Sequence, residues 1–259
     1  MGKVELLAPV GDRDALIAAV QNGADAVYLG GRLFGARANA SNFDGDGLAW
    51  ALDYCHLHGV KLYMTINTLV RDDEMRAVYD MAAEAVAAGI DAAIVQDLGV
   101  AQMLKESFPG LHLHASTQMS IHSASGAQFV KEMGMARVVP ARECTLEEIS
   151  AIAGTGLEVE VFVHGALCVS YSGQCLLSSM IGGRSGNRGR CAQPCRLPYT
   201  LSGEKRYFLS PADLCMRSDL RQLIDAGATS LKMEGRLKRP EYVAVVTAAY
   251  RRALDRALA

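Results

Sequence analysis

The sequence predicts an α/β protein that folds as a (β/α)8 barrel of the TIM type, and three observations support this fold. The first is an alternation of short apolar runs with longer helix-like stretches along the 259 residues. The second is a length that suits one barrel domain, since barrels of about 250 residues are ordinary. The third is a short sequence pattern, a glycine followed by an apolar run, that recurs where a helix ends and a strand begins. Its copies are NGADAVYLG, HGVKLYMTI, AGIDAAIVQ, MGMARVVPA and AGATSLKME.

The apolar runs supply the eight strands that a closed barrel needs. They are Val4–Ala8, Ala26–Leu29, Lys61–Ile66, Ala92–Val95, Leu111–Ala115, Arg137–Pro140, Leu157–Val163 and Ser230–Met233. Helical stretches lie between and after them, as in Arg13–Gln21, Asp73–Ala88, Leu146–Ala153 and Glu241–Leu258. Thr145 and Glu148 form a capping-box pattern at the start of one of these helices. An open doubly wound sheet is the alternative fold, but its G-x-G-x-x-G phosphate fingerprint is absent.

Composition limits the class of protein. Half of the residues are hydrophobic and 21% are charged, as in a soluble globular enzyme. No run of about 18 apolar residues predicts a membrane span, and the opening MGKVELLAPV does not have the pattern of a secretory signal. We therefore expect a cytoplasmic protein and one domain over residues 1–259. The net charge of −2 means that any nucleic-acid contact must use a local basic patch.

One segment, residues 164–215, departs from the strand–helix pattern after the seventh strand, and we call it the cysteine loop. It contains Cys168, Cys175, Cys191, Cys195 and Cys215, and its length favours a functional role. Clustered cysteines in a reducing compartment bind metal or carry out redox chemistry more often than they form disulfides. Iron–sulfur clusters take four thiolates at irregular spacings. Zinc is the alternative, because the spacing of Cys191 and Cys195 suits a zinc-binding pair.

Polar residues follow several of the predicted strands, at the end of a barrel where catalysis takes place. The candidate catalytic residues chosen in this way are Asn67, Gln118, His164, Glu234 and Arg236. An ion pair at the barrel rim is the structural alternative for Glu234 and Arg236. The cysteine loop leaves the seventh strand at the same end, so the sequence places a redox centre over a polar pocket.

A second set of candidates has the chemistry to bind a small anionic ligand or RNA. Arg32, Arg37 and Arg142 could bind a dicarboxylate, since guanidinium matches carboxylate in bidentate geometry. Ser116 follows the fifth strand at the same end of the barrel. Four arginines of the cysteine loop could contact RNA phosphates. They are Arg184, Arg188, Arg190 and Arg196. The structural alternative for all these arginines is a solvated surface charge.

Blocks of sequence along nearly the whole chain resemble a known family. The residues Glu160, Phe162, Gly165, Cys168, Gly173, Cys175 and Ser178 match its signature. Further matching blocks, in the expected order, are ELLAPVGDRDALIAAVQNGADAVYLGG, HASTQMSIHS, RGRCAQPCR, LSPADLCM and LKMEGRLKRPEYV. By this resemblance the chain is identified as a member of the collagenase-like peptidase family U32.

The resemblance implies a function that the peptidase name does not describe. Several family members are oxygen-independent hydroxylation proteins that act on tRNA wobble uridine, on ribosomal RNA or in ubiquinone synthesis. It implies a 4Fe-4S cluster on Cys168, Cys175 and Cys191, with Cys195 or Cys215 as the fourth ligand. It also implies prephenate as the hydroxyl donor, tRNA or rRNA as the partner, and a possible protein partner.

Two other functions remain open at this stage. The family name implies a peptidase, for which Cys168 and His164 could act as nucleophile and base. The sequence has neither an H-E-x-x-H metal-binding helix nor a G-x-S-x-G elbow. A zinc-stabilised RNA-binding module is the third interpretation, and it predicts binding without turnover.

Overall fold

The computed structural model describes residues 4–31, 33–36, 43 and 45–259. Eight parallel strands pair in chain order, and the last of them pairs with both the seventh and the first, which closes a barrel. They are β1 Glu5–Pro9, β2 Ala26–Gly30, β3 Lys61–Ile66, β4 Ala92–Val95, β5 His112–Ala115, β6 Arg137–Val138, β7 Glu158–Gly165 and β11 Ser230–Met233. The predicted TIM-type (β/α)8 fold is therefore confirmed. Arg32 and Arg37 lie outside the described residues.

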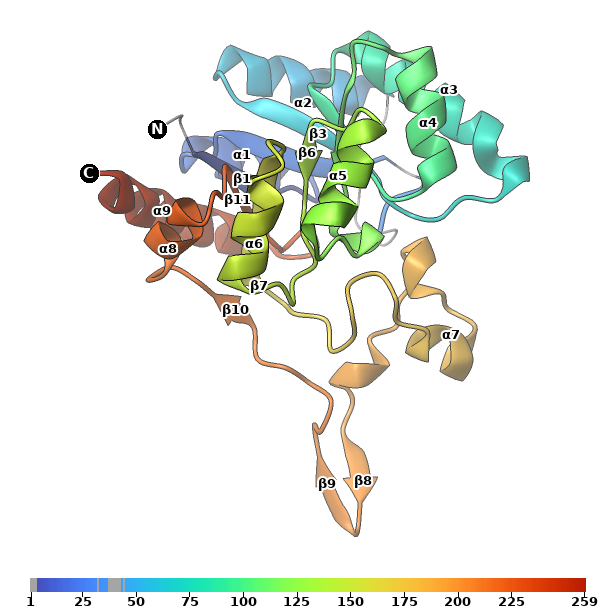
Figure 1. Ribbon diagram of the computed structural model, residues 1–259, viewed down its shortest axis with the longest axis vertical. Helices are drawn as coiled ribbons and strands as arrows, with labels where there is room; N and C mark the ends of the chain where they lie inside the picture. The colour runs from blue at the N-terminus through green and yellow to red at the C-terminus, as the bar shows by residue number, and fades with distance from the viewer. Residues whose placement is uncertain (1–3, 32, 37–42, 44) are drawn as a thin grey trace.

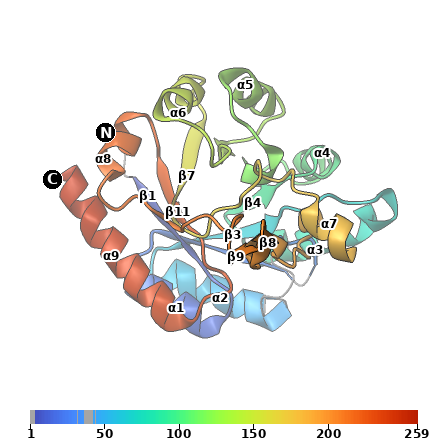
Figure 2. The ribbon, with the colours of Figure 1, turned by 90° about the horizontal axis from the view of Figure 1, so that it is seen from below.

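Helices surround the barrel, as Figure 2 shows. Their bounds are α1 Arg13–Gln21, α2 Gly45–Leu57, α3 Met75–Ala88, α4 Leu98–Ser107, α5 Ala124–Glu132, α6 Leu146–Ala153, α8 Leu220–Asp225 and α9 Pro240–Leu258. The main apolar core lies between these helices and the outer face of the strands. Helix α6 begins with the predicted capping box, in which Thr145 Oγ1 accepts from the N–H of Glu148 and the Glu148 carboxylate accepts from the N–H of Thr145.

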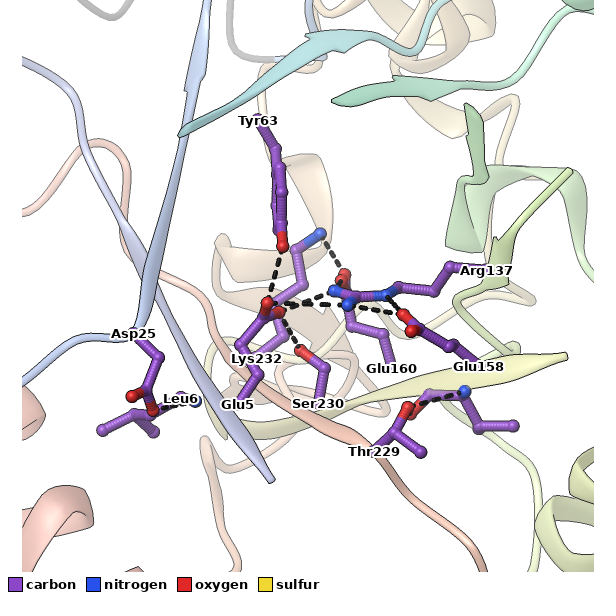
Figure 3. A network of polar contacts seen from close by, with 11 residues as sticks. Glu5, Leu6, Asp25, Tyr63, Arg137, Glu158, Glu160, Thr229, Ser230 and Lys232 are labelled. Atoms are coloured by element: carbon purple, nitrogen blue, oxygen red, sulfur yellow. Dashed lines mark hydrogen bonds and ion pairs between the residues drawn. The ribbon is translucent and has the colours of Figure 1, made fainter. Parts of the chain in front are cut away.

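The interior of the barrel is charged at the level where the strands begin (Figure 3). Arg137 Nη1 lies 2.6 Å from Glu5 Oε1 and 3.1 Å from Glu160 Oε2. Lys232 Nζ lies 2.6 Å from Glu160 Oε1, and Tyr63 donates a 2.5 Å hydrogen bond to Glu5. Two cations therefore face two carboxylates, which offsets part of the large cost of burying each charge.

The cysteine loop contains several short elements outside the barrel. They are α7 Leu177–Gly182, the 3₁₀ turns Gly186–Arg188 and Pro194–Arg196, and the hairpin strands β8 Tyr199–Leu201 and β9 Glu204–Arg206. The loop returns through β10 Leu214–Cys215, which pairs antiparallel to the end of β7. Figure 1 shows the β8–β9 hairpin projecting away from the barrel. Among the described residues, no helix is both long and apolar enough to cross a membrane.

Candidate functional site

A small polar cavity of about 50 Å³, which we call the mouth cavity, lies at the carboxyl ends of the barrel strands. Its lining includes six of the residues that the sequence analysis selected. They are Asn67, Ser116, Gln118, Arg142, Glu234 and Arg236. The rule that barrel enzymes place polar groups at this end explains why residues from distant parts of the chain converge here.

Hydrogen bonds hold one wall of the mouth cavity in place. Asn67 Oδ1 accepts from the N–H of Ala36 at 3.0 Å, and its Nδ2 lies 3.5 Å from Ser116 Oγ. The same hydroxyl oxygen accepts from the N–H of Gln118 at 3.2 Å. Asn67 thus connects the loop after β2 to the turn after β5, and it orients the polar groups of both.

Positive charge predominates in this cavity. The guanidinium of Arg142 lies 4.6 Å from the centre of the Phe162 ring, and buried Arg236 donates to Thr65 Oγ1 at 3.1 Å. Lys232 also lines the cavity, whereas Glu234 is the one carboxylate that does so among the described residues. Glu160 balances Lys232, so the two arginines against one carboxylate give a site that suits an anionic ligand.

Lys232 is a functional candidate that the sequence analysis missed. It lies within the apolar strand β11, where its neighbours are core residues. The signal that could have identified it is strand alternation: Lys232 is two residues before Glu234, and both line the mouth cavity. Burial lowers the pKa of Lys232, while the adjacent Glu160 carboxylate opposes that shift.

His164 lines neither the mouth cavity nor the cavity under the cysteine loop. Its ring packs against Tyr242 and Tyr250 of α9, with Nδ1 3.3 Å from the Tyr250 hydroxyl. Burial lowers the pKa of this histidine. The pairing of β7 with β11 accounts for its direction, because the register shifts between Lys232 and Met233. Such an irregularity interrupts the alternation that would have pointed His164 to the same side as Phe162.

A larger cavity of about 190 Å³ lies under the cysteine loop, and we call it the cysteine cavity. Four cysteines line it: Cys168, Cys175, Cys191 and Cys195. Burial raises the pKa of Cys195, Arg196 lowers it, and the charges of the other three thiols raise it, so each of these three lies within electrostatic range of Cys195. Gln118 and Arg142 line both cavities, so the cysteine cavity adjoins the mouth cavity.

Cys215, the alternative fourth ligand, lies elsewhere. It pairs with His164 across β10 and β7, and its Sγ is 3.8 Å from the Tyr250 hydroxyl. Within the part of the chain that the structure describes, no three His, Cys, Asp or Glu side chains could together hold a metal ion. Four thiols line one cavity, and four is the number of cysteine ligands that a cluster with one cysteine per iron takes.

Two glycines allow the cysteine loop to approach the barrel closely. Gly173 has φ 76°, and a Cβ there would lie 2.3 Å from the Gln118 carbonyl oxygen. Gly189 has φ 71°, and a Cβ there would lie 2.3 Å from the Gly35 carbonyl oxygen. Both positions combine a left-handed backbone with backbone contact, so only glycine fits them without strain.

The four loop arginines differ in their surroundings. Arg188 forms an ion pair with Glu74, and Arg196 donates to the carbonyl oxygens of Leu167 and Pro211. Both therefore hold the cysteine loop in its conformation. Arg184 and Arg190 are exposed, although Arg184 Nε donates to the carbonyl oxygen of Arg190.

The fold and the two cavities define a TIM-barrel protein with a four-cysteine site over the mouth of the barrel. The profile of peptidase family U32 matches residues 11–259, and the chain belongs to this family. It is 44% identical over 263 residues to the 23S rRNA 5-hydroxycytidine C2501 synthase of Escherichia coli (strain K12), covering 98% of this chain and 39% of that protein.

Two further similarities support the family and the fold. The tRNA hydroxylation protein P1 of Bacillus subtilis (strain 168) is 37% identical, over 98% of this chain and 63% of that protein. The chain thus spans less than two thirds of the length of both relatives. The solved structure of the U32 peptidase Mk0906 has a TM-score of 0.64 at 13% identity, covering 91% of this chain and 94% of that one, and it supports the fold alone.

Proposed function

We propose that this protein is an iron–sulfur-dependent, oxygen-independent RNA hydroxylase, and that the mouth cavity binds the anionic compound that supplies the hydroxyl group. The observation that carries the proposal is the shared wall of the two cavities. Gln118 and Arg142 face both the four-cysteine site and a pocket rich in positive charge. A redox centre and a bound anion would therefore lie next to each other.

The relatives support the RNA part of the proposal. One bears the name of an rRNA 5-hydroxycytidine synthase and another that of a tRNA hydroxylation protein, and each is similar over 98% of this chain. Exposed Arg184 and Arg190 are our candidates for RNA phosphate contacts, since Arg188 and Arg196 bind within the chain. An enzyme that acts on tRNA or rRNA works where these RNAs are, so we also propose a cytoplasmic location.

Each group of residues has a distinct role in this proposal. Cys168, Cys175, Cys191 and Cys195 would hold the cluster, which supplies one-electron redox chemistry when bound. Arg142 and Arg236 bind the carboxylates of the donor, for which prephenate is our candidate. Asn67 and Ser116 fix the wall of the pocket, and the cysteine loop covers the pocket against water.

The cysteine residues provide the decisive experiment. Protein purified without oxygen and reconstituted with iron and sulfide should be brown, and dithionite should bleach its visible absorbance. Serine at Cys168, Cys175, Cys191 or Cys195 should lower the bound iron and the absorbance, whereas Cys215→Ser should retain both. A colourless protein that binds zinc in place of iron would overturn the cluster. Mass spectrometry of nucleosides from RNA incubated with enzyme and prephenate then tests hydroxylation.

The structure gives little support to a peptidase that uses Cys168 and His164. Cys168 lines the cysteine cavity, whereas the His164 ring packs against Tyr242 and Tyr250 of α9. A nucleophile and its base need hydrogen-bond contact, directly or after a small rearrangement. The Cys168→Ala and His164→Ala variants should therefore leave any trace of peptidase activity unchanged.

A further inference from the structure

The amine of Lys232 lies in unusual surroundings for a lysine. The residue is 4% exposed, yet it lines the mouth cavity. Its Nζ lies 4.3 Å from the centre of the Tyr28 ring and 5.4 Å from that of Phe162. On its other side, Glu160 Oε1 is 2.6 Å away (Figure 3). The amine is thus enclosed by two aromatic rings and one carboxylate, at the edge of a cavity.

These surroundings favour an uncharged amine more than water does. Burial is the largest influence that lowers the pKa of Lys232, and the positive charges of Arg137 and Arg236 lower it further. Glu160 opposes this shift. Its carboxylate contacts the amine directly and can hold a proton only transiently, because Lys232 and Arg137 outweigh burial and lower its own pKa to about 2. Lysines that form Schiff bases have this combination of burial and neighbouring cations.

The same cavity provides an anchor for a carboxylate. Arg142 and Arg236 line it together with Lys232. Guanidinium groups bind carboxylates in bidentate geometry. A compound that carries a carbonyl group next to its carboxylate would place the carbonyl carbon close to whichever nucleophile lies beside the anchor. In this cavity that nucleophile is the Lys232 amine.

We propose that Lys232 forms an iminium with the carbonyl group of a 2-oxo carboxylate bound in the mouth cavity. Glu160 takes one proton from the ammonium, and the nitrogen lone pair attacks the carbonyl carbon. The C–O bond then breaks, and the oxygen leaves as water with the two remaining amine protons. The proton held by Glu160 returns to the new C=N nitrogen. The inference rests on the proposed use of this cavity for the substrate, but it needs neither cluster nor RNA.

Reductive trapping tests the proposal on protein without added iron. Pyruvate is the probe, and sodium cyanoborohydride reduces any iminium to a stable amine. Intact mass should increase by one pyruvic acid less one oxygen atom, and peptide mapping should place the adduct on Lys232. The label should be lost in Lys232→Arg, which keeps a positive charge opposite Glu160. It should be retained in Lys205→Arg, a matched change on exposed β9.

A ligand without the carbonyl group and a variant with a weakened anchor serve as controls for the trapping experiment. Lactate, which lacks the carbonyl group, should give no adduct. Arg142→Gln should require more pyruvate for the same labelling, because the carboxylate anchor is weakened. If Lys232→Arg does not fold, peptide mapping of the unaltered protein decides alone. The absence of an adduct, or labelling spread equally over surface lysines, overturns the iminium. Iron content and RNA hydroxylation, measured separately, show whether the proposed function stands.

Discussion

Arg188 of the cysteine loop forms a bidentate ion pair with Glu74, which lies immediately before α3. Arg188 Nη1 is 2.7 Å from Glu74 Oε2, and Nη2 is 2.5 Å from Oε1. Nη1 also donates to the carbonyl oxygen of Leu69 at 2.8 Å. Bidentate arginine–carboxylate contacts fix orientation as well as distance. This contact therefore holds part of the cysteine loop against the segment between β3 and α3.

Replacing Arg188 with alanine should loosen the cysteine loop without unfolding the barrel. We expect proteases to cleave the loop several times faster, while the thermal melting temperature of the barrel changes little, because local opening needs only the local contacts to break. Limited proteolysis followed by mass spectrometry measures this. Arg76→Ala is the matched control, since Arg76 pairs with Asp80 on the exposed face of α3. Equal cleavage of the two variants would contradict the role of Arg188.

The same ion pair should make the loop sensitive to acid. Hydrogen bonds from Arg188, and then from the N–H of Arg71, lower the pKa of Glu74 from 4.5 to about 2. A lowered pKa means that the folded state favours the carboxylate, so the stabilisation is complete above pH 4.5 and is lost as the pH falls towards 2. As the pH falls through this range, the backbone amides around Arg188 should therefore lose protection from hydrogen exchange, while those of the barrel strands keep it. The Glu74→Gln variant should lose this dependence, and an unchanged profile would refute it.

Much of the fold could be predicted because its signals are local. Eight apolar runs gave eight strands, and the Thr145–Glu148 pattern gave a helix start. The pattern of apolar runs does not predict the β8–β9 hairpin, although the Ser202–Gly203 dipeptide is a turn signal. Ser202 and Gly203 have φ of 52° and 83°, and two positive values in succession are typical of a two-residue hairpin turn. The hairpin lies within the cysteine loop, whose length and lack of a strand–helix pattern predict only a long loop.

Site residues could be predicted where they follow a strand, because the functional residues of a (β/α)8 barrel lie at the carboxyl ends of its strands. They could not be predicted where the direction of a side chain depends on how two strands pair. Asn67, Gln118 and Glu234 follow strands, so the rule placed them at one end, and the structure brings them together. The direction of His164 depends on a register shift between two strands that are far apart in the sequence. Lys232 lies inside an apolar strand, and its burial beside the mouth cavity and its ion pair with Glu160 emerge only from the assembled barrel.

Gly173→Ala should displace the cysteine loop and impair binding of the proposed cluster. The new Cβ would meet the Gln118 carbonyl, and the left-handed backbone adds strain. Gly183→Ala is a matched control, because Gly183 has φ 64° and its Cβ would meet no atom within 4 Å. Iron bound after reconstitution should fall in the first variant and remain near the original level in the second. Equal iron content in the two variants would show that the close approach of Gly173 does not matter.

Arg137→Ala should destabilise the whole barrel. The change leaves the carboxylates of Glu5 and Glu160 buried without their shared cation, and breaking a buried ion pair in this way costs about 3–5 kcal/mol. Urea denaturation followed by circular dichroism measures the free energy of unfolding. Glu158→Ala is the comparison, because Glu158 pairs with the same arginine but its side chain is 56% exposed, and such pairs contribute roughly 0–1 kcal/mol. If both variants lost a similar amount of unfolding free energy, Arg137 would not be the group that compensates the buried charges of Glu5 and Glu160.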